Sequence, residues 1–171
     1  AHSEAKMATT DDMHRLGRVL SAKWPRFRMR LKMSKDQTPS LLTLGYNAHI
    51  WEELGERCLA CGSCTNVCPT CFCFDVQDEL DINMQDGERA RVWDSCQLHE
   101  FALVAGGHNF RGSKASRVRH RLMRKGKYIK QVHGLTGCTG CGRCERACLV
   151  DITIPGTLNA LHDEMKVESG V

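Results

Sequence analysis

The sequence predicts a mainly α-helical domain in which cysteines, more than a large aromatic core, hold the chain together. Three observations predict this class. The chain of 171 residues contains 11 Cys but only 5 Phe, 3 Trp and 2 Tyr, so bonds made by the thiols must supply part of the folding free energy. Most of the cysteines fall into two runs of identical spacing. The segments around these runs carry apolar residues mainly at helical intervals.

The two cysteine runs repeat the spacing C-x2-C-x2-C-x3-C. This is the bacterial pattern for 4Fe-4S clusters, in which three closely spaced thiolates bind three irons of one cubane. In two-cluster proteins the fourth cysteine of each run binds the other cluster. We therefore expect two crossed clusters. Cluster one takes Cys58, Cys61, Cys64 and Cys148, and cluster two takes Cys138, Cys141, Cys144 and Cys68.

Zinc and disulfides are the alternatives for these eight thiols. Zinc prefers paired C-x2-C units, and each run would leave it with surplus thiols. Thiols with only two or three residues between them make poor bridging partners, and an odd number of cysteines leaves one unpaired. Gly62 and Gly142 lie between the second and third cysteine of each run, where we expect the backbone to pass so close to inorganic sulfide that a Cβ would be crowded.

The segment before the first run is expected to form an N-terminal docking arm over residues 1–47. Residues 1–10 are expected to be a disordered lead, and they lack the apolar segment of a secretory signal. A helix is expected from Asp11 or Asp12 to Ala22, before Pro25. Residues 26–33 alternate basic and apolar side chains, which predicts an extended segment. It is either an ordinary half-buried edge strand or a strand added to a partner subunit.

The remaining residues, 48–171, are expected to form the iron–sulfur domain. A helix over 49–57 would deliver the first run. The 69 residues between Cys68 and Cys138 make an insertion, 69–137, far longer than the connection in a compact two-cluster ferredoxin. Helices are expected in it near 88–105 and 113–129, where apolar residues of the second segment follow the helical period.

Turn residues mark the loop of the insertion, which we expect around Asp86-Gly87. Beyond the second run, residues 151–155 are expected to be extended and residues 158–166 helical. No run of 18 or more apolar residues occurs, so no membrane-spanning helix is expected.

Three further thiols, Cys71, Cys73 and Cys96, lie between the runs. They are either structural thiols, since free Cys is often buried as a small hydrophobe, or three ligands of a third cluster. A third cluster would need a fourth ligand that is not Cys, and His is the plausible type. Two candidates are His99, three residues after Cys96, and His108, which follows two glycines.

The formal charge of +4 includes nine Lys or Arg and no carboxylate in residues 111–130. Such a stretch could bind nucleic acid, but base-stacking aromatics do not interleave it. Each oxidised cluster with its four thiolates carries about −2, so two clusters would bring the net charge to about zero. The cations are better explained as countercharge to the clusters and as a docking face for an acidic partner.

The motifs resemble those of a known group of iron–sulfur subunits. The matching segments are C-L-A-C-G-S-C-T-N-V-C-P-T-C-F-C-F-D-V (58–76), V-W-D-S-C (92–96), A-G-G-H-N (105–109) and C-T-G-C-G-R-C (138–144). They are similar to the β subunit of soluble NiFe hydrogenases (sulfhydrogenases) and to the iron–sulfur subunit of anaerobic sulfite reductase. The resemblance covers about residues 48–155 and implies an α-helical-ferredoxin-like cluster region.

The resemblance implies one further ligand, and the chain differs from the group in two features. Because the group's G-G-H-N element contains His108, the resemblance favours His108 as the fourth ligand of the third cluster. Leu149 stands where the group usually has Pro. The group's subunits carry a large extra N-terminal domain, where this chain has only a short segment before Cys58. In this respect the chain looks more like the small electron-transfer subunit of tungsten enzymes of the aldehyde:ferredoxin oxidoreductase type, among them benzoyl-CoA reductases.

The function expected is a non-catalytic, cytoplasmic electron-transfer subunit. It would relay single electrons through iron–sulfur clusters between a catalytic oxidoreductase subunit and a flavin subunit or ferredoxin, without a membrane. The chain shows no dinucleotide-binding G-x-G-x-x-G. Two alternatives remain open: a cluster-containing redox regulator that binds nucleic acid through residues 111–130, and a catalytic cluster with an open iron site at the third set of thiols.

Overall fold

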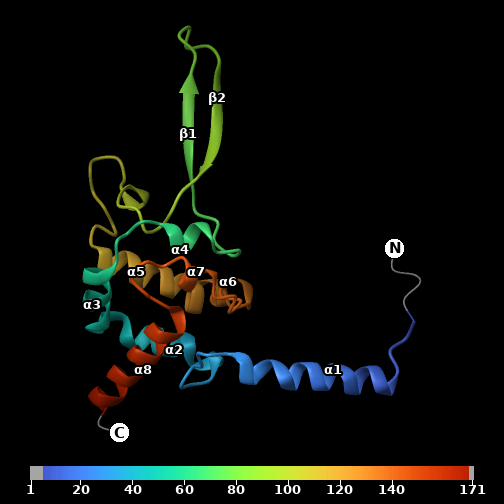
Figure 1. Cartoon of the computed structure of the whole chain (residues 1–171). Helices are drawn as coiled ribbons and strands as arrows, with labels where there is room; N and C mark the ends of the chain where they lie inside the picture. The colour runs from blue at the N-terminus through green and yellow to red at the C-terminus, as the bar shows by residue number, and fades with distance from the viewer. Residues whose placement is uncertain (1–5, 170–171) are drawn as a thin grey trace. The chain divides into compact units, whose positions relative to one another are not determined.

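The computed structural model describes residues 6–169, with side chains as far as Val167 (Figure 1). Its contacts divide the chain into two units, one ending at Arg30 and one beginning at Leu31. The predicted arm of residues 1–47 extends beyond the first unit. Helix α2 (Thr38–Leu44), which that arm included, belongs to the second unit because Leu41, Leu42 and Thr38 are buried in its core.

The first unit contains the expected N-terminal helix, α1 (Thr10–Lys23), and a 3-10 turn, η1 (Trp24–Arg26). Thr9 caps the helix: its Oγ1 accepts from the Asp12 amide at 3.3 Å, and Asp12 Oδ2 accepts from the Thr9 amide at 2.9 Å. This reciprocal pair satisfies free donors of the first turn. Of the lead expected to be disordered, residues 6–9 have no regular structure and residues 1–5 lie outside the described chain.

The alternating segment 26–33 does not form the strand that the sequence predicts. Arg26 ends the 3-10 turn, and the rest has no strand partner within the described chain. Instead, Leu31 and Met33 pack against the core of the second unit, and Lys32 points outward to pair with Asp163. Burial therefore still alternates over residues 31–33. Side-chain packing produces this alternation, and the backbone hydrogen bonds of a β-strand do not.

Helices form the core of the second unit. Trp51 is almost completely buried, and its Nε1 donates to the Gly45 carbonyl at 2.7 Å. Leu42, Leu122 and Leu161 pack in the same cluster. Core residues come from α2, α3 (Ile50–Arg57), α5 (Lys114–Met123) and α8 (Ile154–Ser169). The other helical elements around this core are η2 (Lys35–Gln37), η3 (Gly45–Asn47), the π-helical turn η5 (Arg124–Tyr128) and α6 (Ile129–His133).

The insertion between the cysteine runs contains a β-hairpin where the sequence predicts a helix near 88–105. Strand β1 (Phe74–Leu80) pairs antiparallel with β2 (Gly87–Trp93), in a register that sets Phe74 opposite Trp93. The prediction of a helix near 88–105 is therefore wrong: residues 88–93 belong to a strand, and the rest contains only one short 3-10 turn. Ala90 and Val92 are half-buried while their neighbours are exposed, so the segment has the period of a strand. The hairpin extends away from the helices (Figure 1).

The other expectations for this unit are largely confirmed. The loop around Asp86-Gly87 is the hairpin turn, and α5, η5 and α6 occupy the helical segment near 113–129. A short 3-10 turn, η4 (Glu100–Ala102), follows the hairpin. Helix α8 begins four residues earlier than predicted, so the extended segment ends at Thr153. No helix in the described part of the chain is both long and apolar enough to cross a membrane.

Candidate metal centre

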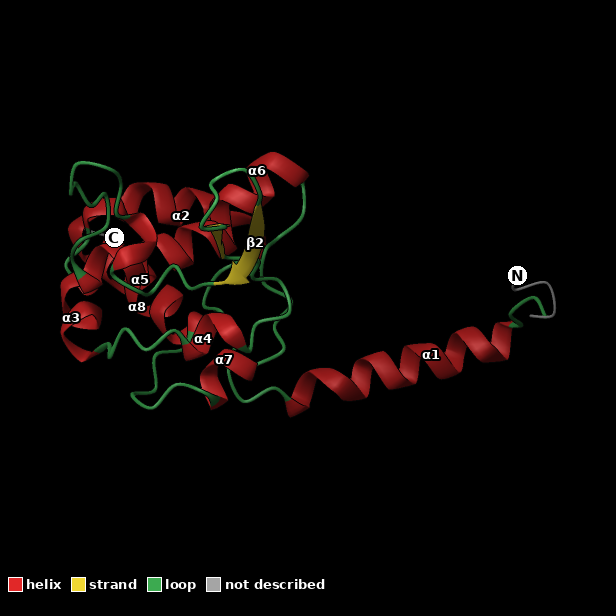
Figure 2. Cartoon of the chain, turned by 90° about the horizontal axis from the view of Figure 1, so that it is seen from above, coloured by secondary structure: helices red, strands yellow, loops and turns green. Residues whose placement is uncertain are grey.

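Both cysteine runs adopt the same local backbone. Each contains a one-turn helix around its third cysteine, α4 (Ser63–Asn66) or α7 (Arg143–Arg146), and the two helices lie side by side (Figure 2). Gly62 and Gly142 begin these helices with φ of +77° and +69°, in the left-handed region that favours glycine. An ideal Cβ on Gly142 would meet nothing within 4 Å. The left-handed backbone conformation by itself favours glycine at Gly142, and the close approach to inorganic sulfide stays a prediction.

The four thiols expected to hold cluster one line a single cavity. Arg121, Gln97 and the apolar side chains of Val118 and Ile152 complete its wall. Burial raises the pKa of the Cys64 thiol in this cavity to about 11, although Arg121 opposes the shift. The fourth cysteine of the second run therefore lies beside the first three cysteines of the first run. The thiols are Cys58, Cys61, Cys64 and Cys148.

Two backbone amides point at sulfur atoms of this first set. The Ala60 amide lies 3.3 Å from Cys58 Sγ, and the Ile152 amide lies 3.3 Å from Cys148 Sγ. Amide donors to ligand sulfur stabilise the thiolate and tune the potential of an iron–sulfur cluster. The loops thus supply donors as well as thiols.

Among the thiols expected to hold cluster two, one pair lies close together. Cys68 and Cys141 lie close enough to interact electrostatically. Burial disfavours the Cys68 thiolate, but hydrogen bonds from Thr70 and the Lys125 ammonium prevail and lower the pKa of Cys68 to about 7. Cys138 lines a separate cavity with Lys125. Cys68 lines a different cavity from Cys138, so these two thiols of the set do not share one hollow there.

A chain of polar contacts ties the two runs together around Lys125. Its Nζ donates to Thr70 Oγ1 at 2.6 Å, and the Thr70 hydroxyl donates to the Gly137 carbonyl at 2.6 Å. The Gly137 amide in turn donates to the Lys125 carbonyl at 3.0 Å. Lys125 lies in the π-helical turn η5, and such turns often occur at functional sites. This turn positions the residue that precedes Cys138 against the end of the first run.

The remaining thiols, Cys71, Cys73 and Cys96, line one cavity together with His120. The Cys96 thiol hydrogen-bonds to Cys73, which lowers the pKa of Cys73 to about 6 and raises that of Cys96. Burial, together with the charges of Arg111 and Arg124, lowers the pKa of His120 to about 4. The imidazole is therefore neutral near pH 7, as a metal ligand must be.

The two histidines that the sequence singled out lie elsewhere. His108 is exposed, and its ring packs edge-on against Phe110 at 4.7 Å between centroids. Neither His108 nor His99 is among the residues that line the cavity of the three spare thiols. The structure therefore does not bring the predicted ligand His108 to these thiols, and it brings His120 instead.

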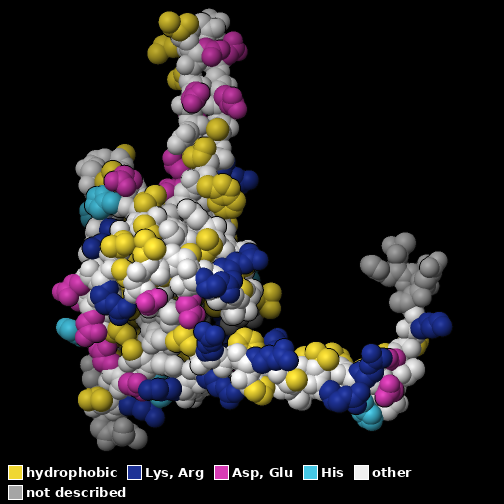
Figure 3. All heavy atoms as spheres, in the orientation of Figure 1, with side chains coloured by type: hydrophobic (Ala, Val, Ile, Leu, Met, Phe, Trp, Pro, Cys, Tyr) yellow, Lys and Arg dark blue, Asp and Glu magenta, His cyan; other side chains and the backbone are white. Residues whose placement is uncertain are grey.

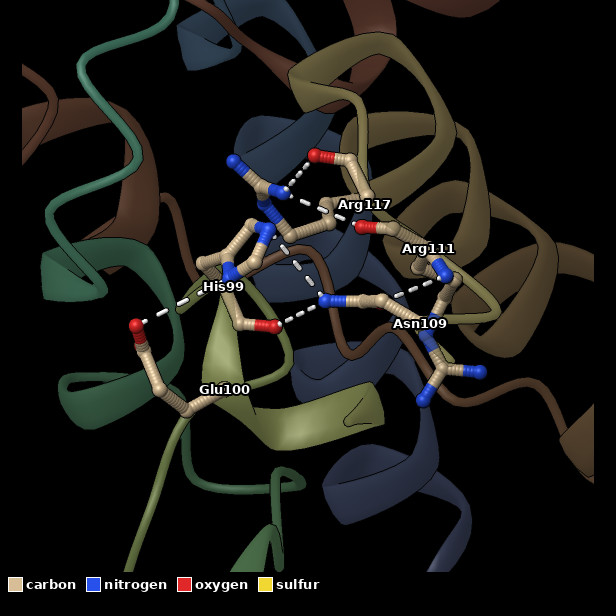
Figure 4. A network of polar contacts seen from close by, with 6 residues as sticks. His99, Glu100, Asn109, Arg111 and Arg117 are labelled. Atoms are coloured by element: carbon tan, nitrogen blue, oxygen red, sulfur yellow. Dashed lines mark hydrogen bonds and ion pairs between the residues drawn. The ribbon is translucent and has the colours of Figure 1, made fainter. Parts of the chain in front are cut away.

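His99 belongs to a polar network that holds the loop before α5 (Figure 4). Asn109 Nδ2 donates to the His99 carbonyl at 2.7 Å, and Asn109 Oδ1 accepts from the Arg111 amide at 2.8 Å. Arg117 Nη1 then donates to the carbonyls of Arg111 and Gly112 at 3.0 and 2.6 Å. The G-G-H-N element thus has a structural role in which Asn109 is the central residue.

Three basic residues at intervals of four, Arg117, Arg121 and Lys125, are buried on one face of α5 and η5. They account for three of the nine cations in the basic stretch 111–130, and burial removes them from any docking or nucleic-acid surface. Their position supports the other expectation for these cations, countercharge, because a buried cation needs a compensating negative charge.

The residues present fit iron–sulfur clusters in chemistry as well as in position. Arg121 Nε and Nη2 are buried without a hydrogen-bond partner in the described chain, which is the expected state of donors whose acceptor is an anionic cofactor. Within the same residues, no three His, Cys, Asp or Glu side chains converge closely enough for a single metal ion.

Comparison with known proteins defines the class. Residues 57–152, more than half of the chain, match the family described as the 4Fe-4S dicluster domain, and the chain belongs to that family. It is therefore an iron–sulfur protein of the two-cluster type, as the paired cysteine runs predict.

A more particular likeness is to sulfhydrogenase 2 subunit beta of Pyrococcus furiosus. The two chains are 42% identical over 89 residues, which make up 52% of this chain and 26% of that relative. The predicted resemblance to iron–sulfur electron-transfer subunits of the sulfhydrogenase β type is thereby confirmed. The chain spans about a quarter of the length of this relative. No solved structure matches.

Proposed function

We propose that this chain is the electron-transfer subunit of an anaerobic multisubunit oxidoreductase and is not itself the catalytic subunit. The observation that carries the proposal is the gathering of Cys58, Cys61, Cys64 and Cys148 in one cavity, because crossed ligation is the arrangement of two-cluster ferredoxins. Membership in the dicluster family and the likeness to a hydrogenase β subunit support it.

Cluster one is held by the set of four just named, and cluster two by Cys138, Cys141, Cys144 and Cys68. When bound, such clusters accept and release one electron at a time. The residues of this chain hold them close to one another, exclude water with Val118 and Ile152, and donate hydrogen bonds to ligand sulfur through the amides of Ala60 and Ile152.

We also propose a third 4Fe-4S cluster at Cys71, Cys73 and Cys96, with His120 in place of His108 as the fourth ligand. The support is the shared cavity and the neutral imidazole of His120. Because Cys71 follows Cys68 by three residues, this cluster would adjoin cluster two. A neutral His ligand leaves the site less negative than four thiolates do, which raises its reduction potential.

The partner is a catalytic oxidoreductase subunit, and a flavin subunit or a ferredoxin exchanges electrons at the other end of the relay. Candidate catalytic partners are those of hydrogenases, sulfite reductases and tungsten enzymes of the aldehyde oxidoreductase or benzoyl-CoA reductase type. The β-hairpin supports contact with a partner. It is an isolated two-stranded sheet, and Leu80, Ile82 and Met84 near its tip are more than two-thirds exposed, which is typical of an interaction site.

Anaerobic purification through a tag on this chain tests the function. The partner subunits should co-purify and should reduce an external acceptor through this chain. In the double variant Cys58→Ala/Cys148→Ala, we expect this transfer to fall at least tenfold, while dyes that accept electrons directly from the catalytic subunit still react. Unchanged transfer to the external acceptor in the double variant would contradict the proposal.

A further inference from the structure

Arg121 occupies an unusual position near the C-terminal end of α5. Only 4% of its surface is exposed. Two of its guanidinium nitrogens, Nε and Nη2, are buried without a hydrogen-bond partner in the described part of the chain. No ion pair with a carboxylate is recorded for it among these residues. A buried cation with unmet donors is strongly unfavourable, so the position requires a negative partner.

The neighbours of Arg121 identify that partner. The guanidinium interacts electrostatically with Cys64, Cys144 and Cys71, and it is within hydrogen-bonding reach of Cys144. These cysteines belong to cluster one, cluster two and the third site respectively. Arg121 also lines both the cavity of the first set of thiols and the cavity of the spare thiols. One side chain therefore lies near members of all three predicted ligand sets.

The two buried cations on either side of Arg121 differ from it. Arg117 Nη1 donates to the carbonyls of Arg111 and Gly112, and Lys125 Nζ donates to Thr70 Oγ1. The Nε of Arg117 is also buried without a partner in the described chain, but Arg117 lines neither of the two thiol cavities. Arg121 thus combines a buried positive charge and unpartnered donors with a position that lines both thiol cavities.

We propose that Arg121 is a positioning residue shared by the clusters, which donates from Nε and Nη2 to their sulfur atoms and holds their reduction potentials at more positive values. This inference rests on the proposed electron-transfer function. Each reduction adds one electron and one negative charge to a cluster. A fixed cation in a site of low dielectric constant stabilises the reduced form more than the oxidised form. The planar guanidinium fork holds its donors in a fixed geometry, whereas a lysine ammonium is a point charge with rotatable donors on a flexible stem.

The test is a redox titration followed by EPR, with dithionite as reductant, on the anaerobically purified full chain. We compare Arg121→Met with Arg119→Met. Arg119 lies on the same helix, but its guanidinium stacks on the Tyr46 ring at 4.1 Å and donates to the Tyr46 carbonyl. Both variants lose one positive charge.

In Arg121→Met, the equilibrium constant for reduction of cluster one, and of at least one further cluster, should fall by about tenfold or more. Each tenfold corresponds to a reduction potential that is lower by about 59 mV for one electron. Arg119→Met should shift each potential much less. Equal potentials in the two variants would overturn the role of Arg121. Absence of reducible clusters from the wild-type chain would instead refute the proposed function.

Arg121→Lys keeps the test decisive if the neutral variant does not assemble its clusters. Lysine retains the charge but not the fork. In protein labelled with 15N in the arginine guanidinium groups, pulsed EPR of the reduced wild type should show 15N coupling to a cluster, and Arg121→Lys should lose the strongest coupling. The same coupling in both proteins, or none in the wild type, would contradict the inference.

Discussion

The fourth cysteine of each run decides which thiols belong to one cluster. Spacing alone groups Cys58, Cys61, Cys64 and Cys68, because they are neighbours in the chain. The cavity instead joins the first three to Cys148. The rule for two-cluster ferredoxins predicts this exchange from the sequence, because it depends only on the repeated motif.

Paired substitutions test the crossing. In Cys58→Ala/Cys148→Ala both removed thiols are ligands of the same cluster, so one cluster should be lost and the others should keep their EPR signals. In the matched control Cys138→Ala/Cys148→Ala, clusters one and two each lose a ligand, so both should be damaged. Counting intact clusters by Mössbauer spectroscopy distinguishes the cases. The reverse pattern would show that each run binds its own cluster.

His120 shows where sequence reasoning stopped. It lies within a run of arginines and lysines. Nothing in the local sequence distinguishes it, as a ligand, from the neighbouring basic residues that were explained as countercharge. Only the packing of α5 against the first run places its ring beside Cys71, Cys73 and Cys96. His108 was favoured for its motif, yet Asn109 is the residue of that motif which makes the structural contacts.

Substitution of the two histidines tests the third cluster. His120→Ala should remove its signal or convert it to a labile form, and His120→Cys should retain the cluster at a lower potential, because an anionic ligand replaces a neutral one. His108→Ala is the control, since that ring is exposed and contacts Phe110. If His108→Ala removed the signal and His120→Ala did not, the ligand assignment would be wrong.

Among the elements, the hairpin was the least accessible to sequence reasoning. Residues 74–93 contain acidic and basic side chains that also suit a helix, and Ala90 and Val92 provide only a weak alternation. The ladder between β1 and β2, with Arg89 bound to Asp78 through two hydrogen bonds of 2.6 and 2.7 Å, selects the strand. The strongly periodic helices α3, α5 and α8 were predicted, with errors mainly at their ends.

The apolar side chains at the outer end of the hairpin give an element-scale test of docking (Figure 3). Changing Leu80, Ile82 and Met84 to Ser should weaken co-purification of the partner at least tenfold. The clusters should be unaffected, and the free energy of unfolding should change by less than about 0.5 kcal/mol per residue, because the side chains are exposed. Val132→Ser/Leu135→Ser, at similarly exposed positions, is the control. Undiminished co-purification would exclude the hairpin as a docking element.

The N-terminal unit is a second docking candidate. Helix α1 has no buried residue, and Leu16, Val19 and Leu20 are about half exposed or more, beside basic side chains. Deletion of residues 1–30 should therefore release the chain from its partner at unchanged iron content. Retention of the partner after this deletion would show that the N-terminal unit does not dock.

At the scale of the whole molecule, the clusters are part of the folding free energy. The core of the second unit is small, and the Arg121 guanidinium is buried between the cavities of the cysteine sets. Without anionic clusters this cation loses its compensation, so the folded state becomes unfavourable. Anaerobic chelation of iron should abolish the cooperative thermal transition seen by far-UV circular dichroism. An iron-free chain that melts like the intact protein would contradict this dependence.

The central claim, a chain of one-electron centres within one small subunit, is tested most directly by iron and acid-labile sulfide analysis combined with an EPR-monitored redox titration of the anaerobically purified protein. The account predicts about twelve irons and twelve sulfides per chain, four of each per cubane, and three reversible one-electron steps whose EPR signals broaden one another as neighbouring centres fill. About eight irons would leave two clusters and remove the third site. Bound zinc, or iron that accepts no electron, would contradict the account as a whole.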